Sequence, residues 1–163
     1  DFFALSFMLL GMNCKDICLL TEESEGRVEF FRSKTSKPFS IKVLPEAQYL
    51  IDKYRGTQGY LLNFVEGKKN YRMFYNRMAY ALPKIKDLLN KRDDGIVIKE
   101  LTSYWARHTW ATIAASLDIP RDTIEAALGH NQHDVTSIYI EFDMRKVDEA
   151  NRKVLDYVLY DKR

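Results

Sequence analysis

The stretch Ser103-Tyr-Trp-Ala-Arg-His-Thr-Trp110 decides how this chain is interpreted, because Leu128-Gly-His130 follows it and Tyr139 comes nine residues later. We expect Arg107 on a helix and His130 directly after a Leu-Gly helix stop. A phosphodiester can be broken without a metal ion when a hydroxyl nucleophile and several cationic donors converge on it. The pattern therefore predicts a phosphate-handling site, with Tyr139 as the nucleophile and Arg107 and His130 as the donors.

Each of these three residues also has an ordinary structural explanation. Arg107 could be a solvated helix residue, although the apolar residues around it predict a cation that needs a partner such as a phosphate. His130 could be only a helix C-cap. Tyr139 could be a core residue, since the chain has 10 tyrosines. The joint order and spacing of the three residues favour a shared function.

The composition is typical of a soluble globular protein. The 163 residues suffice for one domain with a sizeable core, and 29% of them are charged while 46% are hydrophobic. The net charge of +2 neither requires nor excludes a nucleic-acid partner, because a local basic surface decides that question.

The first residues and the cysteines bear on location. The segment from Phe2 to Met12 is apolar, but it is too short to span a membrane and lacks the features of a signal peptide. We therefore expect a core helix and no membrane partner. Cys14 and Cys18 are expected to be buried thiols, which fits a reduced, cytoplasmic setting. Because the chain opens with Asp1, we expect a fragment whose upstream part is missing.

Hydrophobic periodicity and turn residues predict a helix, then a β-hairpin, then helices to the end. In the first part we expect a helix over 2–10 that either ends there or continues toward Leu19, a polar turn at 22–26, and strands at 28–31 and 39–43 around a basic turn at 33–38. In the middle we expect a helix from Pro45 to Gly56, a short strand or buried loop at 60–64, and a helix from Asn70 that Pro83 kinks or stops. In the last part we expect a helix capped by the hydroxyl of Thr102 or Ser103 and ending at Leu117, a helix from Pro120 to Gly129, a helix over 134–140, and an amphipathic helix after Asp143 with Val147, Ala150, Val154, Leu155 and Val158 inward.

The ordered set Arg107-His-Thr, Leu128-Gly-His130 and Tyr139 resembles the catalytic domain of the tyrosine recombinases (phage integrase family), in particular the Bacteroidetes-type integrases. The resemblance runs from the opening helix to Tyr139. It implies a mainly α fold with a small antiparallel β-hairpin or sheet. Residues 1–163 would then be the C-terminal catalytic domain, with the N-terminal core-binding domain absent from this chain.

The family implies site-specific DNA recombination or integration without metal, ATP or another cofactor. Tyr139 would attack a DNA phosphate, giving a 3′-phosphotyrosine and a free 5′ hydroxyl. Arg107 and His130 would hold the non-bridging oxygens, and Lys34 on the hairpin turn would protonate the leaving 5′ oxygen. The 5′ hydroxyl of a second strand would then reverse the reaction on a new partner.

Further residues take roles by the same resemblance. Arg32 and Lys37 are the expected phosphate-positioning contacts in double-stranded DNA. Tyr104 stands where the family usually has a histidine, three residues before the second arginine, and it can still donate a hydrogen bond. His108 would be structural. His108 and His133 lack metal-binding spacing, so we expect no metal site.

The resemblance also implies a homo-tetramer on DNA. In the family the C-terminal helix packs onto a neighbouring protomer, and the segment from Asp143 to Tyr160 is the candidate for that contact. This amphipathic segment could equally fold back onto its own domain.

One position departs from the family pattern. The family's first arginine commonly follows a Gly-Leu or Gly-Met pair, whereas Asn13 follows Gly11-Met12 here and cannot supply a forked cation. Lys15 could reach the site instead, an arginine could come from elsewhere in the fold, or the protein could bind DNA with weak or no cleavage. We favour an active enzyme because the other four residues are present together: Lys34, Arg107, His130 and Tyr139.

Three other classes remain open. A type IB topoisomerase shares the catalytic set but relaxes supercoils. A catalytically weak DNA-binding module would fit Asn13. An all-helical interaction protein would make the motifs accidental, and it would show no salt-dependent DNA binding.

Overall fold

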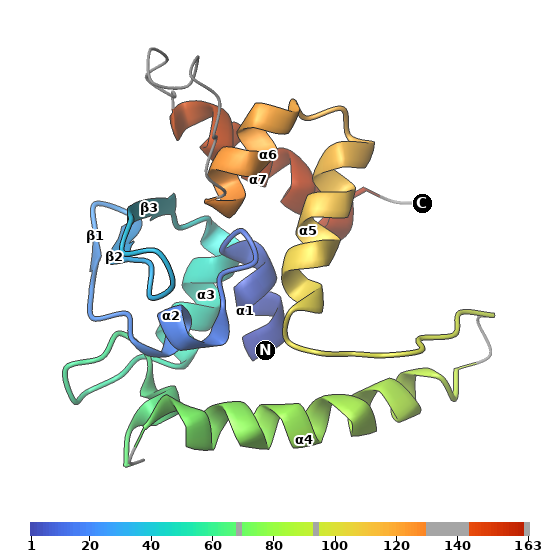
Figure 1. The fold of residues 1–163 in the computed structure, drawn as a ribbon, viewed down its shortest axis with the longest axis horizontal. Coiled ribbons are helices and arrows are strands. Elements are labelled where there is room, and N and C mark those ends of the chain that lie inside the picture. Colours follow the sequence, from blue (N-terminus) through green and yellow to red (C-terminus); the bar gives the residue numbers. More distant parts are fainter. Residues whose placement is uncertain (68–69, 93–94, 130–143, 162–163) are drawn as a thin grey trace.

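The computed structural model describes residues 1–67, 70–92, 95–129 and 144–161 (Figure 1). The fold is mainly helical, with a small three-stranded antiparallel sheet. Its elements in chain order are α1 (Phe2–Met8), α2 (Cys14–Cys18), β1 (Glu23–Ser24), β2 (Arg27–Phe31), β3 (Pro38–Lys42), α3 (Pro45–Lys53), the 3-10 helix η1 (Asn63–Val65), α4 (Tyr71–Leu89), α5 (Trp105–Ser116), α6 (Arg121–Leu128) and α7 (Met144–Leu159). No helix among the described residues is both long and apolar enough to cross a membrane.

Helix α1 lies at the centre of the molecule and packs against α3 on one side and α5 on the other (Figure 1). Helix α5 in turn packs against α6 and α7. One buried amide joins three of these helices, because Trp110 donates to Asn151 at 2.9 Å and Asn151 donates to the carbonyl of Met8 at 2.9 Å. The apolar opening segment is therefore a core helix, as the sequence predicts.

The helix predicted at the start of the chain does not continue toward Leu19. The backbone turns into the left-handed region at Leu10 (φ 59°) and Gly11 (φ 66°), which ends the helical path. A separate short helix, α2, then begins after Asn13, whose side chain accepts a hydrogen bond from the backbone of Asp16. This break places Gly11 and Asn13 in a tight connection between two helices.

The predicted hairpin is confirmed, with strands one residue earlier at the start of each than the pattern indicated. Val28 pairs with Ile41 and Phe30 pairs with Phe39. The prediction of a simple polar turn over residues 22–26 is incomplete, because Glu23–Ser24 forms β1 on the outer side of β2.

Two details of the later helices differ from the pattern. Of the two effects expected of Pro83, a kink or a stop, the stop is wrong, because α4 runs on to Leu89. Pro83 is exposed, so the carbonyl that loses its partner there can be hydrated. Helix α5 is not capped by a hydroxyl of Thr102 or Ser103, since it begins at Trp105 and no side chain caps it.

The remaining segments follow the prediction more closely. Residues 60–64 form no strand but lead into and begin η1, with Leu61, Leu62 and Phe64 buried. Helix α6 starts after Pro120 and ends at Gly129 in the left-handed conformation. The inward face of α7 is as expected except for Val158, which is 44% exposed. The helix predicted over 134–140 and the cap at Asp143 lie outside the described residues.

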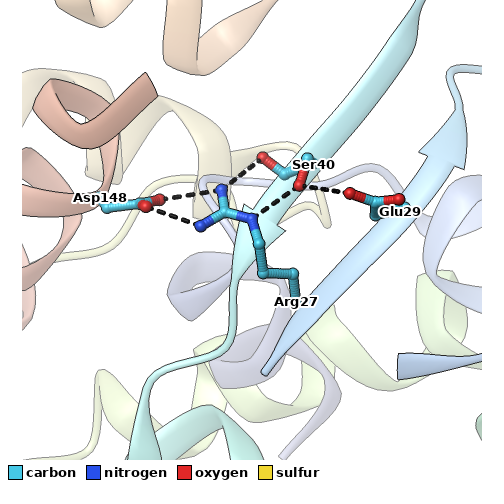
Figure 2. Close-up of polar contacts among 4 residues, drawn as sticks. All are labelled: Arg27, Glu29, Ser40 and Asp148. Atoms are coloured by element: carbon cyan, nitrogen blue, oxygen red, sulfur yellow. Dashed lines mark hydrogen bonds and ion pairs between the residues drawn. The ribbon is translucent and has the colours of Figure 1, made fainter. Parts of the chain in front are cut away.

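Helix α7 folds back onto its own domain. Figure 2 shows Arg27 of β2 between Asp148 of α7 and Ser40 of β3, with bonds of 2.7 and 3.3 Å to the two carboxylate oxygens. The Arg27 side chain also donates to the Ser40 hydroxyl at 2.7 Å, and that hydroxyl donates to Glu29 at 3.0 Å. The sequence left open whether this helix packs onto a neighbouring protomer or onto its own domain, and its apolar face packs onto its own domain.

Candidate functional site

Arg107 is a buried cation on the inner side of α5. It lies beside the buried residues Ala106 and Trp110, and only 7% of its surface is exposed. Its guanidinium donates one hydrogen bond to the carbonyl of Leu128, at the end of α6, and a longer one of 3.4 Å to the carbonyl of Gly11. The helix therefore aims the charge at the C-terminal end of a neighbouring helix.

Arg32 reaches the same place from the sheet. It follows β2 directly, and its Nη1 donates to the carbonyls of Leu128 and Gly129 at 2.8 and 2.9 Å. The free carbonyls and the dipole at a helix C-terminus attract cations. Arginines from two segments far apart in the sequence thus meet at the Leu128–Gly129 corner, which we call the arginine corner (Arg32, Arg107, Leu128 and Gly129).

Two glycines make this close approach possible. A Cβ at Gly11 would lie 2.6 Å from the Cβ of Arg107, and a Cβ at Gly129 would lie 2.6 Å from the ring of Phe39 and 2.7 Å from Arg32. Both glycines also have positive φ, at 66° and 63°. Both positions therefore require glycine, because a side chain would overlap the residues packed there and because the backbone has a positive φ.

The arginine corner carries more positive than negative charge. The pKa of Arg107 falls to about 10, mainly because burial desolvates its guanidinium and also because the charge of Arg32 lies close. Tyr104 and Asp16 act on this pKa in the opposite direction. Arg107 still carries its charge at neutral pH, so the corner is a positive site that an anion would stabilise.

Asn13, at the position that the resemblance predicts for the first arginine, holds the start of α2. Its Oδ1 accepts from the backbone N–H of Asp16 at 2.9 Å, and its Nδ2 donates to the Asp16 carboxylate at 2.5 Å. The other Asp16 carboxylate oxygen accepts from the backbone of Ser33 at 3.0 Å. This buried aspartate therefore ties the hairpin turn to the start of α2.

Sequence reasoning missed Asp16 and the structural use of Asn13. Asn13 followed three residues later by an acidic residue is a variant of the helix capping pattern, and that signal was available in the sequence. The contact of Arg32 with α6 has no such local signal, because it joins residues 96 and 97 positions apart.

The other predicted site residues are more exposed. Lys34 and Lys37 lie on the surface of the hairpin turn. No hydrogen bond or ion pair joins the Lys34 amine to another residue in the described part of the chain. Tyr104 is 53% exposed and meets the ring of His108 edge-on at 4.7 Å between centroids. His108 is itself exposed.

A cavity of about 510 Å³ opens beside Arg107. It lies between the start of α2, the first turns of α4 and the start of α5, and we call it the α2–α4–α5 cleft. Its lining includes Asn13, Lys15 and Tyr104. The structure thus brings Asn13, Lys15 and Tyr104 to the same opening as Arg107.

Two of the predicted catalytic residues, His130 and Tyr139, lie outside the described residues, as does His133. The described chain ends at Gly129 in the arginine corner, one residue before His130, and begins again at Met144. Among the residues described, no group of three or more His, Cys, Asp or Glu side chains is placed to hold a metal ion.

No protein-family model, curated protein or solved structure matches this chain.

Proposed function

We propose that this chain is the catalytic domain of a tyrosine recombinase, which cleaves and rejoins DNA through a 3′-phosphotyrosine intermediate on Tyr139. The observation that carries the proposal is the arginine corner. Two guanidinium groups from α5 and the hairpin meet one residue before His130. A phosphodiester held there would meet two forked cations, and we propose that His130, the next residue in the sequence, is the third donor.

The arginine corner also offers a replacement for the positive charge that Asn13 does not supply. Asn13 cannot supply a cation, but Arg32 lies close enough to Arg107 to affect its pKa. We assign to Arg32 the charge that the family takes from its first arginine. Lys15, on the lining of the cleft beside Arg107, is a second source of positive charge.

In the proposed reaction the Tyr139 hydroxyl loses its proton to water, and its oxygen forms a bond to phosphorus as the bond to the 5′ oxygen breaks. Lys34 gives its proton to the leaving oxygen. Arg32, Arg107 and His130 stabilise the charge on the non-bridging oxygens. Rejoining reverses these steps with a 5′ hydroxyl from a second strand, so the energy of the broken bond is retained in the protein–DNA ester.

Covalent trapping tests the proposal. The protein is incubated with nicked duplexes from the ends of candidate mobile elements, without metal, and products are separated under denaturing conditions. We expect a protein–DNA adduct with the natural chain and none with Tyr139→Phe. The matched control is Tyr49→Phe, which removes a hydroxyl from an exposed tyrosine of α3 and should leave the adduct unchanged. An adduct that persists in Tyr139→Phe would contradict the proposal.

The two arginines give a second readout. Arg32→Gln and Arg107→Gln should each lower the rate of adduct formation by about 100- to 1000-fold, as loss of one donor to a developing oxyanion does. A rate unchanged by Arg32→Gln would remove Arg32 from the reaction and leave it as a cap of α6.

A DNA-binding module with weak or no cleavage is the second candidate. It is favoured by the commitment of Asn13 to the α2 cap. Salt-sensitive binding to duplex DNA without any adduct would favour this module. Relaxation of supercoiled plasmid without strand exchange would instead favour a type IB topoisomerase.

A further inference from the structure

The α2–α4–α5 cleft has the size and the lining of a ligand site. Its volume of about 510 Å³ falls within the usual range for pockets that bind small molecules, about 300–1,000 Å³. Three segments that are far apart in the sequence form its walls, and Arg107 is common to this cleft and to the arginine corner. A ligand in the cleft would therefore lie directly beside the proposed scissile phosphate.

The charges on the cleft select an anion. Lys15 from α2, Arg72 from α4 and Arg107 from α5 all line it. The described lining residues include no aspartate or glutamate. Three cations on one concave surface, without a carboxylate beside them on that lining, favour a negatively charged group such as a phosphate.

The rings on the cleft select a flat, aromatic partner as well. Tyr71 and Tyr75 of α4 and Tyr104 before α5 line it, and Tyr75 and Tyr104 are 43% and 53% exposed. The Lys15 ammonium lies over the Tyr71 ring, 5.9 Å from its centroid. Proteins that bind single-stranded nucleic acids combine aromatic rings with cations, so that bases stack on the rings and phosphates contact the cations.

We infer that the α2–α4–α5 cleft is a nucleotide subsite. It receives one nucleotide of the DNA strand that occupies the arginine corner, with a phosphate toward Lys15, Arg72 and Arg107 and the base against the ring of Tyr75. This inference deepens the proposed function and rests on it for the identity of the strand. The subsite would fix the position of the strand next to the phosphate that reacts.

A binding experiment with matched strands tests this subsite. Fluorescence anisotropy measures the affinity of the protein for a labelled single-stranded oligothymidylate and for an abasic strand of the same length. Tyr75→Ala should weaken oligothymidylate binding about tenfold, because one stacked base contributes about that much or more. It should leave the affinity for the abasic strand unchanged. Tyr75→Phe, which keeps the ring, should bind like the natural chain.

Helix α4 supplies the control variant. Tyr80 is 70% exposed and lies on the same helix but outside the cleft lining, so Tyr80→Ala should leave the affinity for both strands unchanged. Equal losses in Tyr75→Ala and Tyr80→Ala would overturn the subsite. It would also be overturned if Tyr75→Ala weakens binding of both strands equally, or if the protein does not bind oligothymidylate.

The trapping experiment separates this inference from the proposed function. If Tyr139 forms the adduct while Tyr75→Ala binds oligothymidylate normally, the recombinase stands and the subsite is overturned. If no adduct forms but oligothymidylate binding depends on the Tyr75 ring, the recombinase fails and the subsite is supported as a nucleotide site.

Discussion

The close contact between Gly11 and Arg107 makes the arginine corner sensitive to single methyl groups. In Gly11→Ala the new Cβ would lie 2.6 Å from the Arg107 Cβ, at a backbone φ of 66°. We expect a loss of about 2–4 kcal/mol in the free energy of unfolding, from positive-φ strain together with steric overlap. Urea denaturation measures it.

Gly26 provides the control for backbone strain. Its φ is 70°, and a Cβ there would meet nothing within 4 Å. Gly26→Ala should therefore cost only the strain, about 1–2 kcal/mol. Equal losses for the two variants would mean that Arg107 does not need the close approach at Gly11.

Glu46 makes folding sensitive to acid. The pKa of Glu46 is lowered from 4.5 to about 2, chiefly by its hydrogen bond from Arg152 and, against the effect of burial, also by the bond from Tyr160. Because the folded-state pKa is the lower one, the stabilisation is complete above about pH 4.5 and is lost as the pH falls toward 2. Melting temperatures across this range should fall more steeply for the natural chain than for Glu46→Gln. Parallel curves would contradict this role.

At the scale of elements, the ion pair in Figure 2 fixes α7 to the sheet. The side chains of Arg27 and Asp148 are only 26% and 17% exposed, and they meet through two hydrogen bonds. A double-mutant cycle with Arg27→Gln and Asp148→Asn should give a coupling energy of about 1–2 kcal/mol in urea denaturation.

The pair Arg121–Glu125 on α6 is the matched comparison. It is also close, at 2.7 Å, but Arg121 is 91% exposed. Its coupling energy should be about 0.3–0.5 kcal/mol, as for exposed pairs one helical turn apart. A coupling between Arg27 and Asp148 no larger than this would mean that the pair does not anchor α7.

The sequence predicted the elements that depend on interactions between nearby residues better than the features that depend on contacts between distant segments. The hairpin, α6 with its Gly129 stop and most of the inward face of α7 follow local patterns of apolar and turn residues, and the sequence predicted them. The break at Leu10 and Gly11 has local signals in Gly11 and the Asn13 cap, but the contact of Gly11 with Arg107 of α5 has none. Helix α4 continues through Pro83, which is exposed, so this proline did not mark the end of a helix.

The candidate site divides in the same way. The order of residues along the chain selected Arg107 as a candidate cation, and the family resemblance selected Arg32. That both would meet the carbonyl of Leu128 could not be predicted, because the contact joins the sheet, α5 and α6 only in the folded chain. The cleft between α2, α4 and α5 is likewise a product of packing.

At the scale of the whole molecule, the distribution of charge matters more than the net charge of +2. If DNA crosses the hairpin turn on its way to the arginine corner, exposed cations on that turn should neutralise phosphates. Lys34 is exposed, so Lys34→Gln removes a charge without removing a packed side chain. It should weaken binding to duplex DNA and reduce the slope of log K against log salt by about 0.9.

Lys42 tests whether the reduction of the salt slope depends on where the lysine lies on the hairpin. It is an exposed lysine at the other end of the same hairpin, opposite Arg27 in the pairing register. Lys42→Gln changes the net charge of the molecule by the same amount, so an effect of overall charge would reduce both slopes equally. A path of DNA over the turn requires a reduced slope only for Lys34→Gln. Salt titrations of the natural chain and both variants distinguish the two, and equal slopes would place the DNA elsewhere on the surface.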